Sequence, residues 1–216
     1  MGSDLDVLHD YVLETIGTSP TAWPGGWPTE VEAALIDAVF SVRARYGSRE
    51  RRTGVFGAVM RWKDSRGGQA DDLRVLADTD ETQLRTLTNS GRISGRHKAT
   101  VVIEAARAFV AAGVVHAEDV SGRLPEARAA YLSVKGCGPV TWSYFRMLLG
   151  IDDVKADTWL MRFVRDRLPH VKTTEEASRL VSGVASRLGV SATALDHAIW
   201  SYRRTQPVAA TDSDAD

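Results

Sequence analysis

Apolar residues recur at spacings of three and four along most of the chain, which is the pattern of helices with one buried face. The first clear example follows Thr29 and Glu32, a pair with the sequence of a capping box. Its apolar positions are Val31, Leu35, Ala38, Val39 and Val42. The spacing predicts a helix with one buried face at this point.

Helix signals continue through the rest of the chain, and no alternation typical of strands competes with them. Helices are predicted near 70–77, 81–88 and 97–112, the last of which ends at Gly113. Pro125 and Pro139 suit the first position of a helix, and Gly136 and Gly150 suit the end of one. Thr173 and Ser191 are the expected N-caps of the last two helices. We therefore expect an all-α protein of about eight to ten helices.

The two ends of the sequence differ from the middle. Residues 17–28 are rich in Gly, Pro and Trp, and residues 205–216 contain little that a core could bury. We expect an N-terminal segment over 1–28, a helical domain over 29–204 and a disordered acidic tail over 205–216. A chain of 216 residues can close one core, or two small lobes that share an interface.

Composition excludes several classes of protein. No stretch approaches the roughly 18 apolar residues of a membrane span, and Asp4, Asp6 and Asp10 stand where a signal peptide would be positively charged. These features predict a cytoplasmic protein without a membrane partner. Cys137 is the only cysteine, which excludes an internal disulfide and any cluster that needs several thiolates from this chain. We expect no metal and no cofactor.

The net charge of −1 hides an uneven distribution. All 27 Lys and Arg residues lie between 41 and 204, against 18 Asp and Glu, so that this part carries about +9. Such a charge suits a polyanionic partner such as DNA. An arginine-rich surface that is merely solvated would give the same count, so charge alone does not show that the protein binds a polyanion.

A glycine-rich turn between two predicted helices offers a more specific signal. It runs Val134-Lys135-Gly136-Cys137-Gly138, and Pro139 follows as the first residue of a helix. Glycines allow close approach of a ligand to the backbone, and amides at a helix N-terminus attract anions. The turn could bind a DNA phosphate without reading sequence, or it could be an ordinary connection between helices.

The surrounding residues resemble a known signature. Leu132 to Trp142, followed by Ala156-Asp157-Thr158, is similar to the helix-hairpin-helix, Gly/Pro loop and Asp motif of endonuclease III-type DNA glycosylases. The likeness extends in chain order over roughly 29–203. It implies two helical lobes around a DNA-facing cleft, in a variant without an iron–sulfur cluster. It also implies double-stranded DNA as partner, and we expect a monomer associated with the nucleoid.

Asp157 matches the essential aspartate of that family. A carboxylate beside the sugar would stabilise the oxocarbenium-like transition state of N-glycosidic bond cleavage and orient the attacking water. Asp157 is also placed to cap a helix that begins at Thr158. The two roles are compatible.

The resemblance further implies that the target base leaves the duplex and enters a pocket. Candidate pocket walls are Trp62, Trp142, Tyr144 and Trp159, although core packing would explain each of them equally. The candidate DNA-binding residues are Val134, Lys135, Gly136, Cys137, Gly138, Thr141, Arg43, Arg45 and Lys98.

Two departures from the family pattern affect the expected activity. Val140 stands where bifunctional members carry a lysine, and valine cannot form the imine that strand cleavage requires. Trp159 stands where relatives tend to have His. We expect a monofunctional glycosylase that acts on a damaged or mismatched base, whose identity the sequence does not give. The alternatives are a non-catalytic helix-hairpin-helix DNA-binding protein, and a fold with another partner in which the acidic residues 1–40 cover the basic surface.

Overall fold

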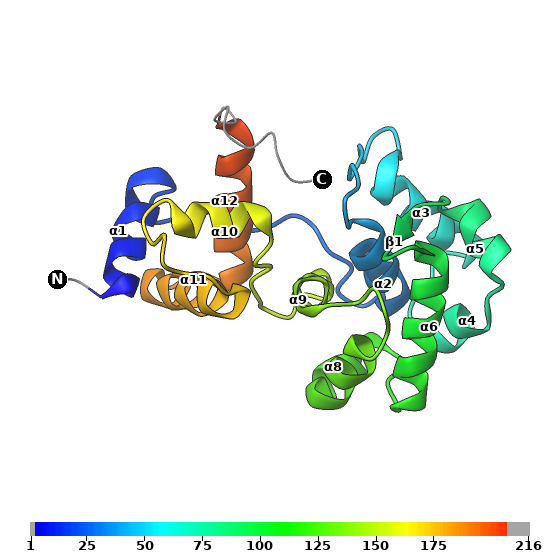
Figure 1. Cartoon of the computed structure of the whole chain (residues 1–216). Coiled ribbons are helices and arrows are strands. Elements are labelled where there is room, and N and C mark those ends of the chain that lie inside the picture. Colours follow the sequence, from blue (N-terminus) through cyan, green and yellow to red (C-terminus); the bar gives the residue numbers. More distant parts are fainter. Residues whose placement is uncertain (1–2, 207–216) are drawn as a thin grey trace. The chain divides into compact units, whose positions relative to one another are not determined.

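The computed structural model describes residues 3–206, and their regular structure is almost entirely helical (Figure 1). The expectation of an all-α fold is confirmed. Two compact units divide the chain: unit 1 holds the residues up to Pro24 and those from Asp152 on, and unit 2 is Gly25–Ile151. The segment expected over 1–28 therefore contributes to both units. Of the expected acidic tail, residues 207–216 lie outside the described part.

Unit 2 is built around one buried helix. Its elements are α2 (Val31–Phe40), α3 (Gly54–Ser65), α4 (Leu73–Asp78), α5 (Glu81–Leu87), β1 (Arg92–Ile93), β2 (Arg96–His97), α6 (Lys98–Ala111), α7 (Ala117–Gly122), α8 (Leu124–Leu132) and α9 (Pro139–Leu148). Every residue of α2 is buried, and α2 packs against α3, α4, α6 and α9. Other helices cover all sides of α2, so even its two carboxylates, Glu32 and Asp37, are buried, and both accept hydrogen bonds.

The predicted helix at Val31 is confirmed, but the capping box before it is wrong. The N-cap of α2 is Glu30, which makes no side-chain cap, and the first amide of α2 donates instead to Asp71 Oδ1 at 3.0 Å. The Glu32 carboxylate is buried and accepts hydrogen bonds from Trp62 Nε1 at 2.8 Å and from Arg66 Nε at 3.1 Å. Burial raises the pKa of Glu32. Glu32 thus connects α2 to α3.

A short β-hairpin that the sequence analysis did not predict joins α5 to α6. Strands β1 and β2 are antiparallel, with Ile93 paired to Arg96. Ser94 and Gly95 form the turn between them with φ values of 50° and 79°. Two consecutive positive φ angles are typical of the tight type I′ hairpin turn.

Unit 1 consists of α1 (Asp4–Thr15), α10 (Thr158–Arg165), α11 (Thr174–Leu188) and α12 (Ala192–Thr205). The core between them includes Leu8, Val12, Phe163, Val184, Leu195 and Ile199. The N-caps predicted at Thr173 and Ser191 are confirmed, since each side-chain oxygen accepts an amide of the first turn, at 3.2 Å and 3.0 Å.

The acidic helix α1 is held by contacts inside unit 1. Asp6 forms an ion pair with Arg187 at 2.7 Å, and Tyr11 donates a hydrogen bond to Asp166 at 3.0 Å. Ser3 caps the helix. Glu14 also lies 3.3 Å from Arg167 of the same unit. Because Asp6 and Glu14 are paired within the unit, they give no support to the alternative in which the N-terminal acids cover a basic surface. Among residues 3–206, no helix is long and apolar enough to cross a membrane.

Candidate functional site

The predicted turn between two helices is present in unit 2 as the α8–α9 hairpin, residues 133–138. Gly136 has φ of +109°, a backbone conformation that other residues rarely adopt. A Cβ atom at this position would lie 3.2 Å from Val101 Cγ2 of α6. The turn closes through a hydrogen bond from the Cys137 amide to the Val134 carbonyl at 3.0 Å. Glycine at 136 is therefore required by both conformation and space.

Thr141 braces this hairpin from the first turn of α9. The Gly138 amide donates to Thr141 Oγ1 at 3.0 Å, and Thr141 Oγ1 donates to the Gly138 carbonyl at 2.9 Å. The first helical bond of α9 runs from the Trp142 amide to the Gly138 carbonyl, so the amides of Val140 and Thr141 precede the hydrogen-bonded part of the helix. These two amides, at the positive end of the helix dipole, form a candidate anion site.

The side chains of the hairpin differ in what they can contact. Val134 is buried, whereas Lys135 is exposed. Burial raises the pKa of the Cys137 thiol to about 11, which keeps it protonated at neutral pH. Val134 and Cys137 could therefore contact a ligand mainly through their backbone, whereas Lys135 presents an exposed cationic side chain.

The β1–β2 hairpin lies against the α8–α9 hairpin. Arg96 Nη1 donates to the Lys135 carbonyl at 3.4 Å, and Ile93 Cγ2 lies 3.4 Å from where a Cβ atom of Gly136 would be. Arg96 also forms an ion pair with Glu104, and Arg92 on β1 is exposed. The sequence analysis missed them, although Ser94-Gly95 between two short segments is a sequence that favours a tight turn.

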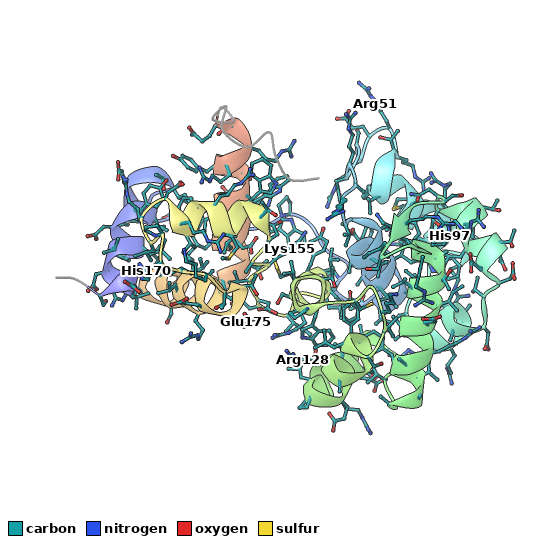
Figure 2. The ribbon with its side chains drawn as sticks, in the orientation of Figure 1. Arg51, His97, Arg128, Lys155, His170 and Glu175 are labelled. Carbon is teal, nitrogen blue, oxygen red and sulfur yellow. The ribbon has the colours of Figure 1, made fainter. Side chains whose placement is uncertain are left out.

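The loop between α2 and α3 carries five arginines, and Arg43 and Arg45 are exposed on it. Arg52 pairs with Asp64 at 2.6 Å, and the Arg49 guanidinium lies over the Phe56 ring at 5.5 Å. Figure 2 shows Arg51 at the far end of the loop. The exposed members of this group remain candidates for contact with phosphates.

Lys98 requires a correction, because its ammonium group is used inside the protein. The side chain is 5% exposed, and Nζ donates to the carbonyls of Phe40 at 2.9 Å and Val42 at 2.6 Å. These carbonyls lie at the end of α2, where no helical amide follows to satisfy them. Burial lowers the pKa of Lys98. Lys98 anchors the start of the arginine loop rather than facing a ligand.

We expect Lys98→Met to lower the free energy of unfolding by about 1–3 kcal/mol, because two carbonyls lose their buried donor. The salt dependence of DNA affinity should stay close to that of the wild type. If the exposed Lys135 contacts a DNA phosphate, Lys135→Met should leave stability unchanged and make the salt dependence of DNA affinity shallower. Chemical denaturation and titration with duplex DNA at several salt concentrations measure the two effects. A shallower salt slope for Lys98→Met would contradict this assignment.

Two of the four candidate pocket residues are core side chains, which corrects the expectation that they line a base pocket. Trp62 is 1% exposed, and Trp142 is 4% exposed with its ring 5.6 Å from that of Tyr131. Tyr144 is half-buried, and its hydroxyl donates to Asp37 Oδ1 at 3.3 Å. All three belong to unit 2 and help to hold α2, α3 and α9 in place.

Asp157 caps α10 in unit 1, as predicted. Its Oδ1 accepts hydrogen bonds from the amides of Trp159 at 2.9 Å and Leu160 at 3.3 Å. Its Oδ2 lies 4.0 Å from Lys155 Nζ, and the side chain is 26% exposed. One carboxylate oxygen is thus occupied by the helix, while the other lies near a cation and is accessible to a reactant.

The segment that leads to Asp157 is fixed to the start of α12. Asp152 accepts the amides of Ala192 at 3.0 Å and Thr193 at 2.8 Å, and caps α12 in this way. Val154 and Ala156 are buried, whereas the side chains of Lys155 and Asp157 are 25% and 26% exposed. Figure 2 labels Lys155 in this segment. The backbone therefore holds Asp157 in a defined position.

Trp159 is half-buried, as Tyr144 is, and the Arg162 guanidinium lies 5.8 Å from the centroid of its ring. A second aromatic group, which the sequence analysis missed, follows one face of α12. His197 stacks on Trp200 at 5.6 Å, Trp23 lies 6.4 Å from His197, and Arg204 covers Trp200 at 4.4 Å. The spacing of three and four residues on α12 was the signal that could have found this row.

Comparisons with known proteins bear on the family and the fold. A family model described as "Domain of unknown function (DUF8548)" matches residues 7–204. The chain belongs to this family. No curated protein matches the sequence. Within residues 3–206, no group of three or more His, Cys, Asp or Glu side chains is placed to hold a metal ion.

A solved structure is similar over most of the chain. It is the 8-oxoguanine DNA glycosylase of Methanocaldococcus jannaschii, with a TM-score of 0.53 and 17% sequence identity. The match covers 93% of this chain and 87% of that chain. At this identity the likeness shows the fold alone, so the DUF8548 chain has a fold similar to that of a DNA glycosylase.

Proposed function

We propose that this protein is a monofunctional DNA glycosylase of base-excision repair. It would hydrolyse the N-glycosidic bond of a damaged or mismatched base that has left the duplex. The observation that carries the proposal is the position of Asp157, a partly accessible carboxylate at a helix N-terminus in a glycosylase-like fold. The fold similarity adds weight to the resemblance of the motif residues.

The chemistry needs a fixed negative charge beside the sugar. As the bond to the base breaks, positive charge develops on the sugar ring, and a preorganised carboxylate lowers the energy of that state. Asp157 Oδ1 is held by two amides of α10, which leaves Oδ2 for the sugar or for the attacking water. The products would be a free base and an abasic site.

Unit 2 would hold the DNA backbone. The amides of Val140 and Thr141, together with Lys135, form a site for one phosphate at the N-terminus of α9. Arg43, Arg45 and Arg92, which are exposed, are further candidates for phosphate contacts, whereas the Arg96 guanidinium is already paired with Glu104. Such contacts position the duplex without reading its sequence.

The residues suited to hold an extruded base lie in unit 1. Trp159 follows Asp157 by two residues, and His197 and Trp200 present a half-exposed aromatic row on α12. Stacking between aromatic side chains is the usual way to hold a flipped base. Trp159 and this row replace Trp62 and Trp142 as the proposed pocket residues.

The absence of strand cleavage is expected from Val140, which offers no amine for an imine with the sugar. The test incubates the full chain with duplexes that bear uracil, alkylated, oxidised or mismatched bases. We expect scission of one substrate only after hot alkali, and no protein–DNA adduct with borohydride.

Two results would contradict this proposal in different ways. Scission without alkali, with a borohydride adduct, would show lyase activity, and Lys155→Ala would then test whether the amine near Asp157 forms the adduct. An inert panel, together with salt-sensitive DNA binding, would favour the non-catalytic DNA-binding protein.

A further inference from the structure

Asp196 is a buried carboxyl group in unit 1 to which the proposed mechanism gives no role. It lies in the first turns of α12, between the core residues Leu195 and Ile199, and is 8% exposed. Acidic side chains are seldom buried unless they have a partner. The partner of Asp196 is found in the segment that leads to Asp157.

The contact is made to the backbone. Asp196 Oδ2 accepts a hydrogen bond from the Lys155 amide at 2.7 Å, and the Lys155 carbonyl accepts the Asp157 amide at 2.7 Å. Lys155 Nζ lies 4.0 Å from Asp157 Oδ2. Asp196 therefore holds both the peptide that precedes Asp157 and the residue whose cation faces Asp157.

The charged groups around Asp196 oppose its ionisation more than they favour it. Asp157 and Asp153 face it with like charge, Lys155 faces it with opposite charge, and His197 follows it on α12 with a pKa lowered by burial. Burial first, and the charge of Asp157 second, raise the pKa of Asp196 to about 8 from its ordinary value of 3.8. Asp196 is therefore mostly protonated at neutral pH.

We propose that Asp196 is a positioning residue for Asp157: by accepting the Lys155 amide it fixes the segment 153–157 to α12 and so holds the backbone that presents Asp157. This inference rests on the proposed function of Asp157, which it deepens. If Asp196 ionised, its negative charge would repel that of Asp157 and would compete with Asp157 for the Lys155 ammonium.

Stability measurements test the protonation without any substrate. An acid whose pKa is raised by folding binds its proton more tightly in the folded state, so the contribution of Asp196 to the stability of the wild type should fall as pH rises from about 4 to about 8. Asp196→Asn has no proton to lose, so its melting temperature should rise relative to the wild type across that interval. Asp10→Asn is the matched control, because the Asp10 side chain is 82% exposed. The melting temperature of this variant should change with pH as that of the wild type does.

Activity measurements test the positioning. Asp196→Ala removes the acceptor of the Lys155 amide and should slow base release by about 10- to 100-fold, as expected when a reacting group moves by an ångström or so. Asp196→Asn keeps an oxygen acceptor and should recover most of that loss. The wild-type rate should decline as pH passes about 8, and the decline should be absent in Asp196→Asn.

If the melting temperatures of wild type and Asp196→Asn changed with pH in the same way from pH 4 to 9, the protonation part of the inference would be overturned. A wild-type rate in Asp196→Ala, or the same alkaline decline in Asp196→Asn, would overturn the positioning part. The proposed glycosylase function would survive either result. If the protein cleaves none of the substrates, the proposed glycosylase function is contradicted. The pH dependence of the melting temperatures would still show whether Asp196 is protonated.

Discussion

Asp157→Asn is expected to slow base release by about 10²- to 10³-fold or more, the effect of removing a preorganised electrostatic stabiliser. The change removes the charge while keeping the shape, and Asn caps a helix about as well as Asp does. Folding and DNA affinity should therefore be retained. Single-turnover assays on the best duplex of the panel measure the rate, and thermal denaturation measures the stability.

Asp166→Asn is a suitable control for this prediction. Asp166 lies at the other end of α10, where it forms an ion pair with Arg203 at 2.8 Å. It also accepts the Tyr11 hydroxyl at 3.0 Å, so Asp166→Asn should lower the free energy of unfolding by about 1 kcal/mol and leave the rate near the wild-type value. Equal rates for wild type and Asp157→Asn would show that Asp157 is only a helix cap.

Gly138→Ala is expected to weaken affinity for undamaged duplex DNA by about tenfold or more without affecting stability. Gly138 has φ of −146°, which any residue adopts, and a Cβ atom there meets no protein atom within 4 Å. The added methyl group points into open space beside the first turn of α9, where a phosphate would approach. Loss of one hydrogen bond to a charged group is worth about 1.5–3 kcal/mol.

Gly136→Ala is the matched comparison within the same hairpin. Its positive φ and the short distance to Val101 mean that an alanine is strained, so stability should fall by about 1 kcal/mol or more. A loss of affinity in Gly136→Ala alone would reflect distortion of the hairpin. A loss in Gly138→Ala at full stability identifies the phosphate site, and unchanged affinity there would contradict it.

Local sequence signals predicted the local structure well. Asp157, Thr173 and Ser191 were predicted as N-caps because a short polar side chain precedes an apolar pattern, and all three cap their helices. Pro139 and Gly150 likewise marked the beginning and the end of α9, whereas α8 ends at Leu132, before Gly136. In each case the interacting groups are within a few residues of one another, so the sequence contains the information.

Long-range contacts account for the wrong predictions. Glu32 was assigned to a capping box, but its carboxylate accepts a hydrogen bond from Trp62, which is 30 residues away. Lys98 was assigned to DNA because it is a cation, but its acceptors at the end of α2 are 56 and 58 residues away. No local pattern reports which group a side chain will meet across the fold.

The candidate site shows the same division. The signature gave Asp157 directly, whereas Asp196 is 41 residues from Lys155 in the sequence and becomes its partner only when α12 folds against the segment before α10. The aromatic row with Trp23, His197 and Trp200 also combines separate parts of the chain. Sequence therefore indicated the chemistry of the site, and the structure supplied its supporting residues.

The most direct test of the glycosylase assignment does not depend on guessing the lesion. DNA treated with deaminating, alkylating or oxidising agents is incubated with the full chain, and the bases released into solution are identified by mass spectrometry. We predict release of one or a few modified bases with an equal number of abasic sites, and no release by Asp157→Asn. DNA binding without release of any base by the wild type would contradict the account.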